Sequence, residues 1–397
     1  MSKLYIYAHT LIDGVSEQPK YEKLITIEDS VITNIEDYHE INEEAIEVNT
    51  LTPGFFNCHV HIFYPVGFDS KKEFTLIEKA FYAKKHCEQY LESGVTFIRV
   101  VGTENNYDLQ IKEAIENKVI AGPHMYCAGK VICMTGGHGW QEGIEADGKD
   151  ACRKAARQQL KAGVDLIKVM ATGGVMTKGV EPGNAQLSVE EMKVIVEEAH
   201  KANRKTASHA QGLQGIKNTL YAGIDSIEHR CFLDEECLEL MQKQNTFLVP
   251  TLCAPQCILD KGVENGVAKY AVDKTLKVTK AHVESVKKAY AKGIQIALGT
   301  DAGTPFNYHS NTAYEMELMA QLNISNMDII KIATINSAKC LGVEKDYGSI
   351  EVGKQADLVC LNENPLDDIS NVRKINRVIQ SGRIVVDNTR QGSSLSF

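Results

Sequence analysis

The chain lacks any apolar run long enough to cross a bilayer, and its first residues show no apolar leader segment. We therefore expect a soluble protein without a signal peptide. A basic excess is also missing, because 43 Lys and Arg stand against 52 Asp and Glu, which gives a net charge of −9. A nucleic acid or an anionic membrane would need a basic face, so the composition disfavours both and leaves a small-molecule substrate as the expected partner.

The sequence has no cysteine framework. Its eleven cysteines are scattered through predicted strands and helices, and an odd number without regular spacing argues against a disulfide scaffold. Such cysteines are typical of a reducing compartment, where most of them act as small buried apolar side chains. We expect a cytoplasmic location.

Short apolar strands separated by turn residues occupy both ends of the chain. They cover residues 4–7, 23–27, 31–35, 356–361, 375–379 and 383–386. A chain of 397 residues suits one large domain plus a smaller one. We expect the strands of the two ends to pair into one small β domain.

Between the two ends, apolar strands alternate with helical segments such as 149–162 and 189–202. The predicted strands are 51–59, 96–102, 124–129, 166–172, 206–210, 225–229, 246–252 and 295–300. Eight strand–helix units are the number in a closed (β/α)8 barrel, whose catalytic groups sit at the carboxyl ends of the strands. Four long connections are candidate substrate loops: 130–148, 173–187, 253–266 and 302–312.

Polar side chains end several of these apolar strands. They are His59, His61, Lys168, His209, His229 and Asp301. Two histidines at i and i+2 of one strand point to the same face, where neutral imidazoles can bind one transition metal. A lysine inside an apolar strand is costly unless it is neutralised or paired. Carbamylation by CO2 would convert Lys168 into a carboxylate that can bridge two cations.

Each of these residues alone has a simpler explanation. A strand-end histidine is often a hydrogen-bonded core residue, Lys168 suits a buried ion pair, and Asp301 suits a helix cap. Their occurrence in this order on eight strands favours one shared metal site.

Together, these residues make the chain resemble the amidohydrolase superfamily. The resemblance covers essentially the whole chain and rests on Pro53-Gly54 before His59 and His61, on Lys168, His209 and His229, on Gly299-Thr300-Asp301-Ala302-Gly303, and on the tail motif 348–359. It implies an α/β fold in which residues 51–349 form a distorted (β/α)8 TIM-type barrel. Residues 1–50 and 350–397 would form a small β-sandwich domain.

The resemblance also implies the roles of the site residues. His59, His61 and Asp301 would hold one divalent ion, His209 and His229 a second, and carboxylated Lys168 would bridge them. Two such ions, which the donor set suggests are zinc, can share a hydroxide that attacks an amide carbonyl. Asp301 would carry the proton from that hydroxide to the leaving nitrogen.

Within the superfamily, the chain is most similar to prolidase-like (Xaa-Pro and Xaa-Arg) dipeptidases and N-acyl amino acid hydrolases. The similarity rests on segments 135–139 and 171–175. His138 matches a residue that orients the scissile amide or the substrate carboxylate, and its alternative is an exposed loop histidine. Relatives carry a tyrosine after the sixth strand where this chain has Arg230, which is a candidate replacement. Trp140, the single tryptophan, either lines the pocket or packs under its loop.

Three functions follow from this sequence. The first is a binuclear metal-dependent amide hydrolase acting on a dipeptide or an N-acyl amino acid. The second is a hydrolase of cyclic amides or imidazolone-type rings. The third, a catalytically silent scaffold, is disfavoured because all six expected metal ligands are present. This architecture often assembles, so a homo-oligomer is a further expectation.

Overall fold

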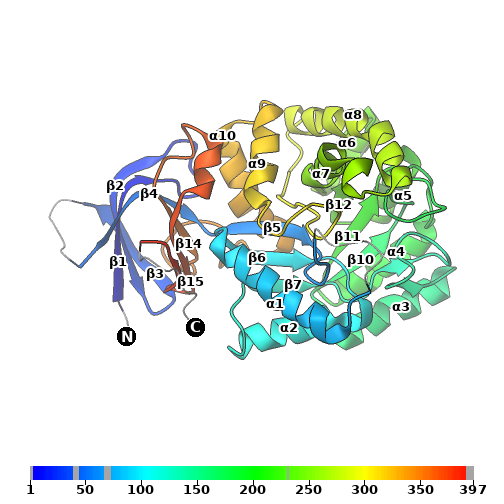
Figure 1. Ribbon diagram of the computed structural model, residues 1–397, viewed down its shortest axis with the longest axis horizontal. Helices are drawn as coiled ribbons and strands as arrows, with labels where there is room; N and C mark the ends of the chain where they lie inside the picture. Colours follow the sequence, from blue (N-terminus) through cyan, green and yellow to red (C-terminus); the bar gives the residue numbers. More distant parts are fainter. Residues whose placement is uncertain (1–2, 39–43, 67–72, 230–231, 390–397) are drawn as a thin grey trace.

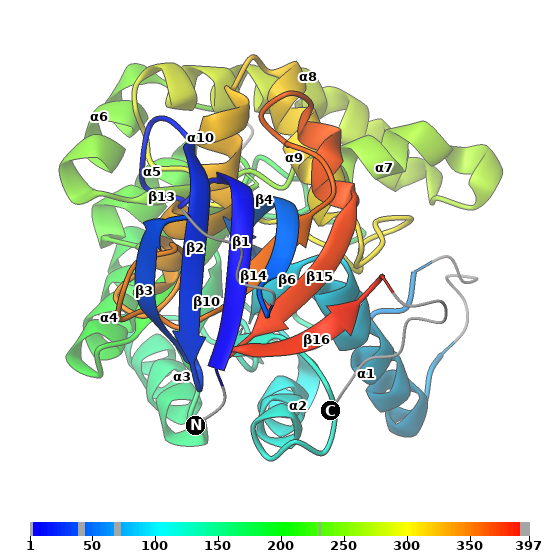
Figure 2. The same cartoon turned by 90° about the vertical axis from the view of Figure 1, so that its left-hand side faces the viewer.

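The structure is a computed structural model that describes residues 3–38, 44–66, 73–229 and 232–389. Strands from both ends of the chain pair in one sheet, which lies on the left of Figure 1 and faces the viewer in Figure 2. Across this sheet the strand order is β16-β15-β14-β4-β1-β2-β3. The strands are β1 (Lys3–Leu11), β2 (Lys20–Glu28), β3 (Val31–Asp37), β4 (Ile46–Pro53), β14 (Leu358–Leu361), β15 (Ile375–Gln380) and β16 (Arg383–Asp387).

An apolar core holds this terminal sheet together. Ile6 and Ala8 lie two residues apart on β1 and are fully buried, as the period of two in a strand requires. They pack in one cluster with Ile25 of β2, Leu51 of β4 and Leu358 of β14. The cluster therefore joins the first strands of the chain to a strand that follows them by some three hundred residues.

The remaining strands run parallel in two further sheets, so the fold is mixed α/β. One sheet has the order β5-β6-β7 and the other β13-β12-β11-β10-β8-β9. The strands are β5 (Phe55–Val60), β6 (Val95–Val100), β7 (His124–Cys127), β8 (Ile132–Cys133), β9 (Ile144–Glu145), β10 (Leu166–Met170), β11 (Lys205–Ala210), β12 (Ser226–His229) and β13 (Phe247–Val249).

Helices follow these strands and cover them (Figure 1). They are α1 (Leu76–Glu92), α2 (Tyr107–Glu116), α3 (Lys149–Ala162), α4 (Val189–Lys201), α5 (Leu213–Ala222), α6 (Glu235–Gln244), α7 (Cys253–Lys261), α8 (Lys269–Ala291), α9 (Thr312–Gln321), α10 (Asn326–Lys331) and α11 (Ser337–Leu341). Helices α1 and α4 begin with capping boxes, Thr75 with Glu78 and Ser188 with Glu191.

Backbone hydrogen bonds also connect the two parallel sheets to each other. The Asp165 N–H, just before β10, donates to the carbonyl of Cys127 in β7 at 2.9 Å. On the opposite side, residues 295–302 lie between β13 and β5. There the Leu248 N–H donates to Gln295 at 2.9 Å and the Cys58 N–H donates to Leu298 at 2.7 Å.

The segment 295–300 is not the regular strand that we expected. It forms a single bridge, between Ile296 and Leu248. Gly299 lies so close to β5 that a Cβ there would be 2.8 Å from the Cβ of His59. The next N–H, that of Thr300, donates to the side-chain oxygen of Asn57 at 3.2 Å. A side chain therefore takes the place of a strand partner here.

The prediction of a loop over 253–266 is also wrong, because the first part of this segment is helix α7. The buried carboxylate of Glu315 accepts hydrogen bonds from the N–H groups of Leu252 and Cys253, both at 2.8 Å. A carboxylate stabilises the free N–H groups at a helix N-terminus. Because Glu315 lies on α9, far away in the sequence, local sequence could not reveal this cap.

No helix in the described ranges is long and apolar enough to cross a membrane. The ten cysteines within these ranges are free and buried, which agrees with their predicted role as small core side chains. Cys58 is one of them, and its thiol points to the backbone of Ser337, away from the site that His59 lines.

Candidate metal centre and active site

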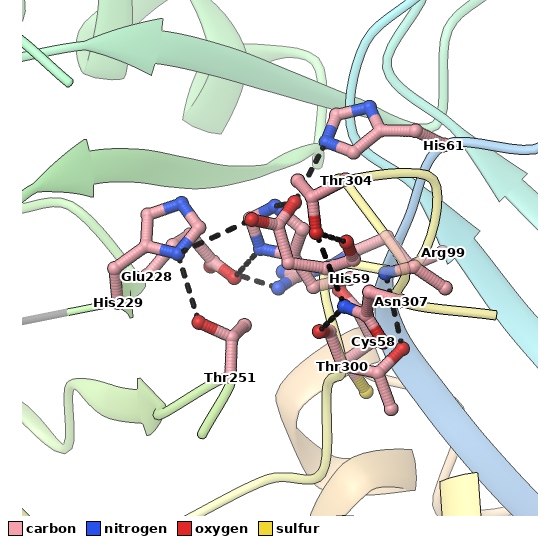
Figure 3. A network of polar contacts seen from close by, with 12 residues as sticks. Cys58, His59, His61, Arg99, Glu228, His229, Thr251, Thr300, Thr304 and Asn307 are labelled. Atoms are coloured by element: carbon pink, nitrogen blue, oxygen red, sulfur yellow. Dashed lines mark hydrogen bonds and ion pairs between the residues drawn. The ribbon is translucent and has the colours of Figure 1, made fainter. Parts of the chain in front are cut away.

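A cavity of about 310 Å³ lies at the carboxyl ends of the parallel strands. The six side chains predicted from the strand ends all line it: His59, His61, Lys168, His209, His229 and Asp301. Figure 3 shows His59 and His61, at the end of β5, and His229, at the end of β12, pointing toward one another. Their rings form a chain of close neighbours, with centroids 5.4 Å apart for His59 and His61 and 4.7 Å apart for His59 and His229.

His59 and His61 converge on the carboxylate of Asp301. Oδ1 of Asp301 is 3.3 Å from Nε2 of His59 and 3.1 Å from Nε2 of His61. The other ring nitrogen of His59, Nδ1, donates to the carboxylate of Glu228 at 2.7 Å. In the neutral tautomer that donates from Nδ1, Nε2 of His59 would present a lone pair to the Asp301 carboxylate. Two acceptors at this distance suit a cation that both bind.

His229 and His209, like His59, each have one ring nitrogen bound by another group of the protein. Nδ1 of His229 is 2.8 Å from the hydroxyl of Thr251, and Nε2 of His209 donates to the carbonyl of Gly173 at 3.2 Å. Each contact fixes one ring nitrogen, as is usual for metal-binding histidines, and Nδ1 of His229 also lies 3.9 Å from Oδ2 of Asp301. The ligand atoms of His59, His229 and Asp301 lie within 4.8 Å of one another.

The backbone is in the left-handed region at three of these positions. φ is +71° at His229, +51° at Thr251 and +58° at Asp301. Residues other than glycine adopt such angles at a cost, and they do so most often at functional sites. His229 ends β12, Thr251 follows β13 and Asp301 follows the segment 295–300, and all three side chains line the cavity.

Sequence reasoning missed a buried ion pair beneath the histidines. Arg99 of β6 and Glu228 of β12 are almost completely buried, and Nη2 of Arg99 donates to Glu228 at 2.8 Å. Burial raises the pKa of Glu228, but Arg99 and Lys168 overcome that effect and hold the pKa well below its usual value. The carboxylate therefore stays charged and keeps the Nδ1–H of His59 bound. An arginine inside the apolar strand Val95–Val100 was the sequence signal for this pair.

Lys168 is 1% exposed, and its Nζ has no hydrogen-bond partner among the described residues. Burial lowers the pKa of Lys168 to about 8. A buried amine without a partner is costly, and only the neutral amine can react with CO2. The donor set fits divalent metal ions: four imidazoles, three of them oriented by protein groups, one carboxylate, and one unpartnered amine that could become a carbamate.

His138 lies in the cavity beside these residues rather than in an exposed loop. Its ring centroid is 4.4 Å from that of His209, and Nδ1 is 2.7 Å from the hydroxyl of Thr177. Burial lowers the pKa of His138 to about 4, so the ring is neutral at pH 7. The ring lies against Gly174, where a Cβ would come within 2.4 Å of Nε2. The glycine stretch after β10 is thus the surface on which His138 rests.

One lysine fastens the loop that carries Thr177. Lys274 of α8 is buried, and its ammonium donates to the carbonyls of Thr177 at 2.9 Å and Val180 at 2.6 Å. Val175 and Met176 of the same loop line the cavity. Helix α8 therefore fixes both a wall of the cavity and, through Thr177, the orientation of His138.

Of two further predicted candidates, one does not line the cavity and the other lies outside the described residues. The side chain of Trp140 is 46% exposed and is not among the residues that line the cavity. Arg230, the candidate replacement for a tyrosine, lies outside the described residues. Gln211, which the sequence reasoning did not select, does line the cavity.

Comparison with known proteins agrees with this geometry. The model of the amidohydrolase family matches residues 50–385, most of the chain. The chain belongs to the amidohydrolase family. Its class of reaction is accordingly hydrolysis of carbon–nitrogen bonds of the amide type, and members of this family generally bind metal ions.

Individual relatives are similar over nearly their full length. An ochratoxinase of Aspergillus niger is 31% identical over 404 residues, covering 92% of this chain and 82% of that protein. The crystal structure of a Xaa-Pro dipeptidase with bound methionine superposes with a TM-score of 0.90 at 33% identity and covers 96% of this chain and 99% of the other. An imidazolonepropionase of Picrophilus torridus is 24% identical over 363 residues, 86% of each chain.

The contact between Gly174 and His138 gives a prediction. Gly174→Ala should push the His138 ring out of place and lower kcat/KM by roughly 10²-fold, the scale for misplacing an active-site group by about 1 Å. The metal content should not change, since the three atoms nearest to this Cβ all belong to His138. Steady-state kinetics and elemental analysis are the measurements.

Gly183→Ala is the matched control, because its Cβ would point into open space in the same loop. Wild-type kinetics in Gly174→Ala would show that the position of His138 does not matter.

Proposed function

We propose that the protein is a two-metal amide hydrolase whose substrates are dipeptides or N-acyl amino acids with an apolar side chain. The observation that carries this proposal is the convergence of four histidines, Asp301 and the unpartnered Lys168 on one cavity. The family membership and the similarity to a Xaa-Pro dipeptidase and an ochratoxinase support the same reaction.

In this proposal, His59, His61 and Asp301 would hold one divalent ion, and His209 and His229 would hold a second. Lys168, as a carbamate, would supply an anionic ligand between them. Zinc suits the imidazole and carboxylate donors. Ions bound there would supply Lewis acidity to polarise the amide carbonyl and a water acidic enough to attack it.

The residues of the chain then have distinct tasks. Asp301 takes the proton from the attacking water and gives it to the leaving nitrogen, which a carboxylate facing the cavity can do. His138 is neutral, and when Thr177 donates to its Nδ1, its Nε2–H can donate to the substrate carbonyl or carboxylate. Glu228 and Thr251 keep His59 and His229 oriented throughout.

The walls of the cavity support an apolar substrate side chain. Apolar lining residues come from the loop after β10 and from helices α7 and α8, among other elements: Val131, Met170, Val175, Met176, Ala254, Pro255, Ile258, Val278 and Pro305. A cavity of about 310 Å³ is at the small end of ligand pockets, which suits a dipeptide-sized molecule.

A cyclic amide or imidazolone-type ring is the second candidate substrate, and the similarity to an imidazolonepropionase favours it. The long apolar wall argues for the first candidate, because a small polar ring would leave Ile258 and Val278 without a contact.

We further propose that the parallel strands close into a (β/α)8 barrel over residues 51–349. The backbone bonds between β7 and the start of β10, and from 295–302 to both β13 and β5, support closure. Residues 1–50 and 350–397 would form the separate β-sandwich domain.

The direct test of the function is a substrate screen with zinc-loaded protein. We expect turnover of dipeptides or N-acyl amino acids with Leu, Met or Phe side chains, at higher kcat/KM than for Asp or Lys side chains. The assay measures release of the amino group. Turnover of cyclic amides alone would replace the proposal with the second candidate, and turnover of nothing by metal-loaded protein would favour the silent scaffold.

The bridging role of Lys168 has its own readout. Wild-type protein should contain about two divalent ions per chain, whereas Lys168→Ala should lose at least one and nearly all activity. Lys193→Ala, at an exposed position on α4, is the control and should keep both. Elemental analysis measures the ions. Full metal content in Lys168→Ala would mean that another group bridges them.

Asp301→Asn separates proton transfer from metal binding. Asn keeps the shape and one acceptor oxygen but cannot take up a proton at neutral pH. We expect substantial metal content and a kcat lowered by at least about 10²-fold, the lower end for general acid–base catalysis. A variant that binds two ions and turns over at the wild-type rate would reduce Asp301 to a ligand.

A further inference from the structure

Gln211 is a cavity residue to which the mechanism above gives no task. It follows β11 and lies two residues after His209, so both side chains face the cavity that they line. Its backbone is fixed, because its N–H donates to the hydroxyl of Thr172 at 3.1 Å. The next residue, Gly212, packs so tightly that a Cβ would lie 2.0 Å from the carbonyl oxygen of Gly183. The backbone that carries the Gln211 side chain is therefore held in place.

The amide oxygen of Gln211 is buried and unsatisfied. The residue is 8% exposed, and its Oε1 has no hydrogen-bond partner within the described ranges. A buried carbonyl oxygen without a hydrogen-bond donor destabilises the folded protein. Such an oxygen in a binding cavity therefore needs an explanation, and a donor on the ligand is one. An oxygen of this kind can only accept a hydrogen bond. The ligand that completes it must bring an N–H or an O–H.

We propose that Gln211 Oε1 accepts a hydrogen bond from the N–H of the scissile amide, and that the enzyme therefore prefers secondary amides to tertiary ones. This inference rests on the proposed function. The scissile bond must lie beside the proposed metal-binding residues, and Gln211 adjoins one of them, His209. In an N-acyl amino acid with an apolar side chain, the scissile amide carries the N–H donor of the substrate, so it is the group that would complete Gln211 Oε1.

The contact would also help the reaction. As water adds to the carbonyl, the nitrogen becomes pyramidal and develops a lone pair that must accept a proton. A hydrogen bond from this N–H to Gln211 would direct the lone pair of the nitrogen away from Gln211. Asp301 would then deliver the proton to that face of the nitrogen. A bond to proline has no N–H and cannot make the contact. The inference thus separates this chain from the Xaa-Pro dipeptidase that it resembles in fold.

The test compares two substrates that differ only at this nitrogen: an N-acyl alanine and the corresponding N-acyl-N-methylalanine, with the acyl group taken from the best substrate of the screen. Wild-type enzyme should favour the N–H substrate in kcat/KM by at least about 10-fold. In Gln211→Met, which keeps the length but not the acceptor, kcat/KM for the N–H substrate should fall by roughly 10- to 10²-fold, the scale for losing one hydrogen bond to a buried polar group. The value for the N-methyl substrate should change little.

Two further variants make the test specific. Gln211→Glu keeps an acceptor oxygen, so the preference for the N–H substrate should survive in it even if both rates fall. Gln158→Met makes the same change at an exposed position on α3 and should leave both rates unaltered. Metal content is measured for every variant.

The outcomes are distinguishable. An equal loss on both substrates in Gln211→Met, or a collapse of the preference in Gln211→Glu, would overturn the inference and leave the proposed function intact. Unchanged kinetics in Gln211→Met would do the same and would mean that water satisfies the oxygen. Failure of metal-loaded wild-type protein to hydrolyse either substrate would overturn the proposed function and the inference with it.

Discussion

The carboxylate of Glu228 is the constraint on which the site depends. It accepts hydrogen bonds from Arg99, from the hydroxyl of Ser226 and from Nδ1 of His59, all inside the protein. Arg99 also donates to the backbone carbonyl of Cys58 at 2.5 Å, so one ion pair ties β5, β6 and β12 together. Removing either charge would leave the other buried and alone, a far larger loss than that of a surface pair. His59 owes its tautomer and its orientation to this pair.

Uncharged groups orient the other histidines of the site in the same way, through hydrogen bonds. Thr251 holds His229, the carbonyl of Gly173 holds His209, and Thr177 holds His138. In each of these imidazoles one ring nitrogen is bound by a group of the protein, and all three rings line the cavity. A site built in this way loses little entropy when it binds its ligands, because the rings are already oriented. The left-handed backbone at His229 and Asp301 is the conformational cost of that arrangement.

The sequence was informative where polar residues interrupt apolar runs. His59, Lys168, His209, His229 and Asp301 each stand out from an apolar strand, so their convergence could be predicted from strand order alone. The family was predicted correctly from these residues, and the family match confirms it. Contacts between distant segments could not be predicted in this way. Glu315 caps α7 from another helix, and Asn57 replaces a strand partner at Thr300. Both are single side chains whose partner is invisible in local sequence.

The terminal sheet has a consequence for the order in which the protein is made. Strand β4 runs through Pro53 and Gly54 directly into β5, which carries His59, and β4 pairs with β14 from the far end of the sequence. During synthesis on the ribosome, the first site histidines emerge early, but the edge of β4 stays open until β14 follows. Contacts of such long sequence separation are slow to form. The open edge of β4 in the nascent chain could therefore pair with other chains. Chaperones that shield this edge would raise the yield of folded protein without changing the stability of the folded enzyme.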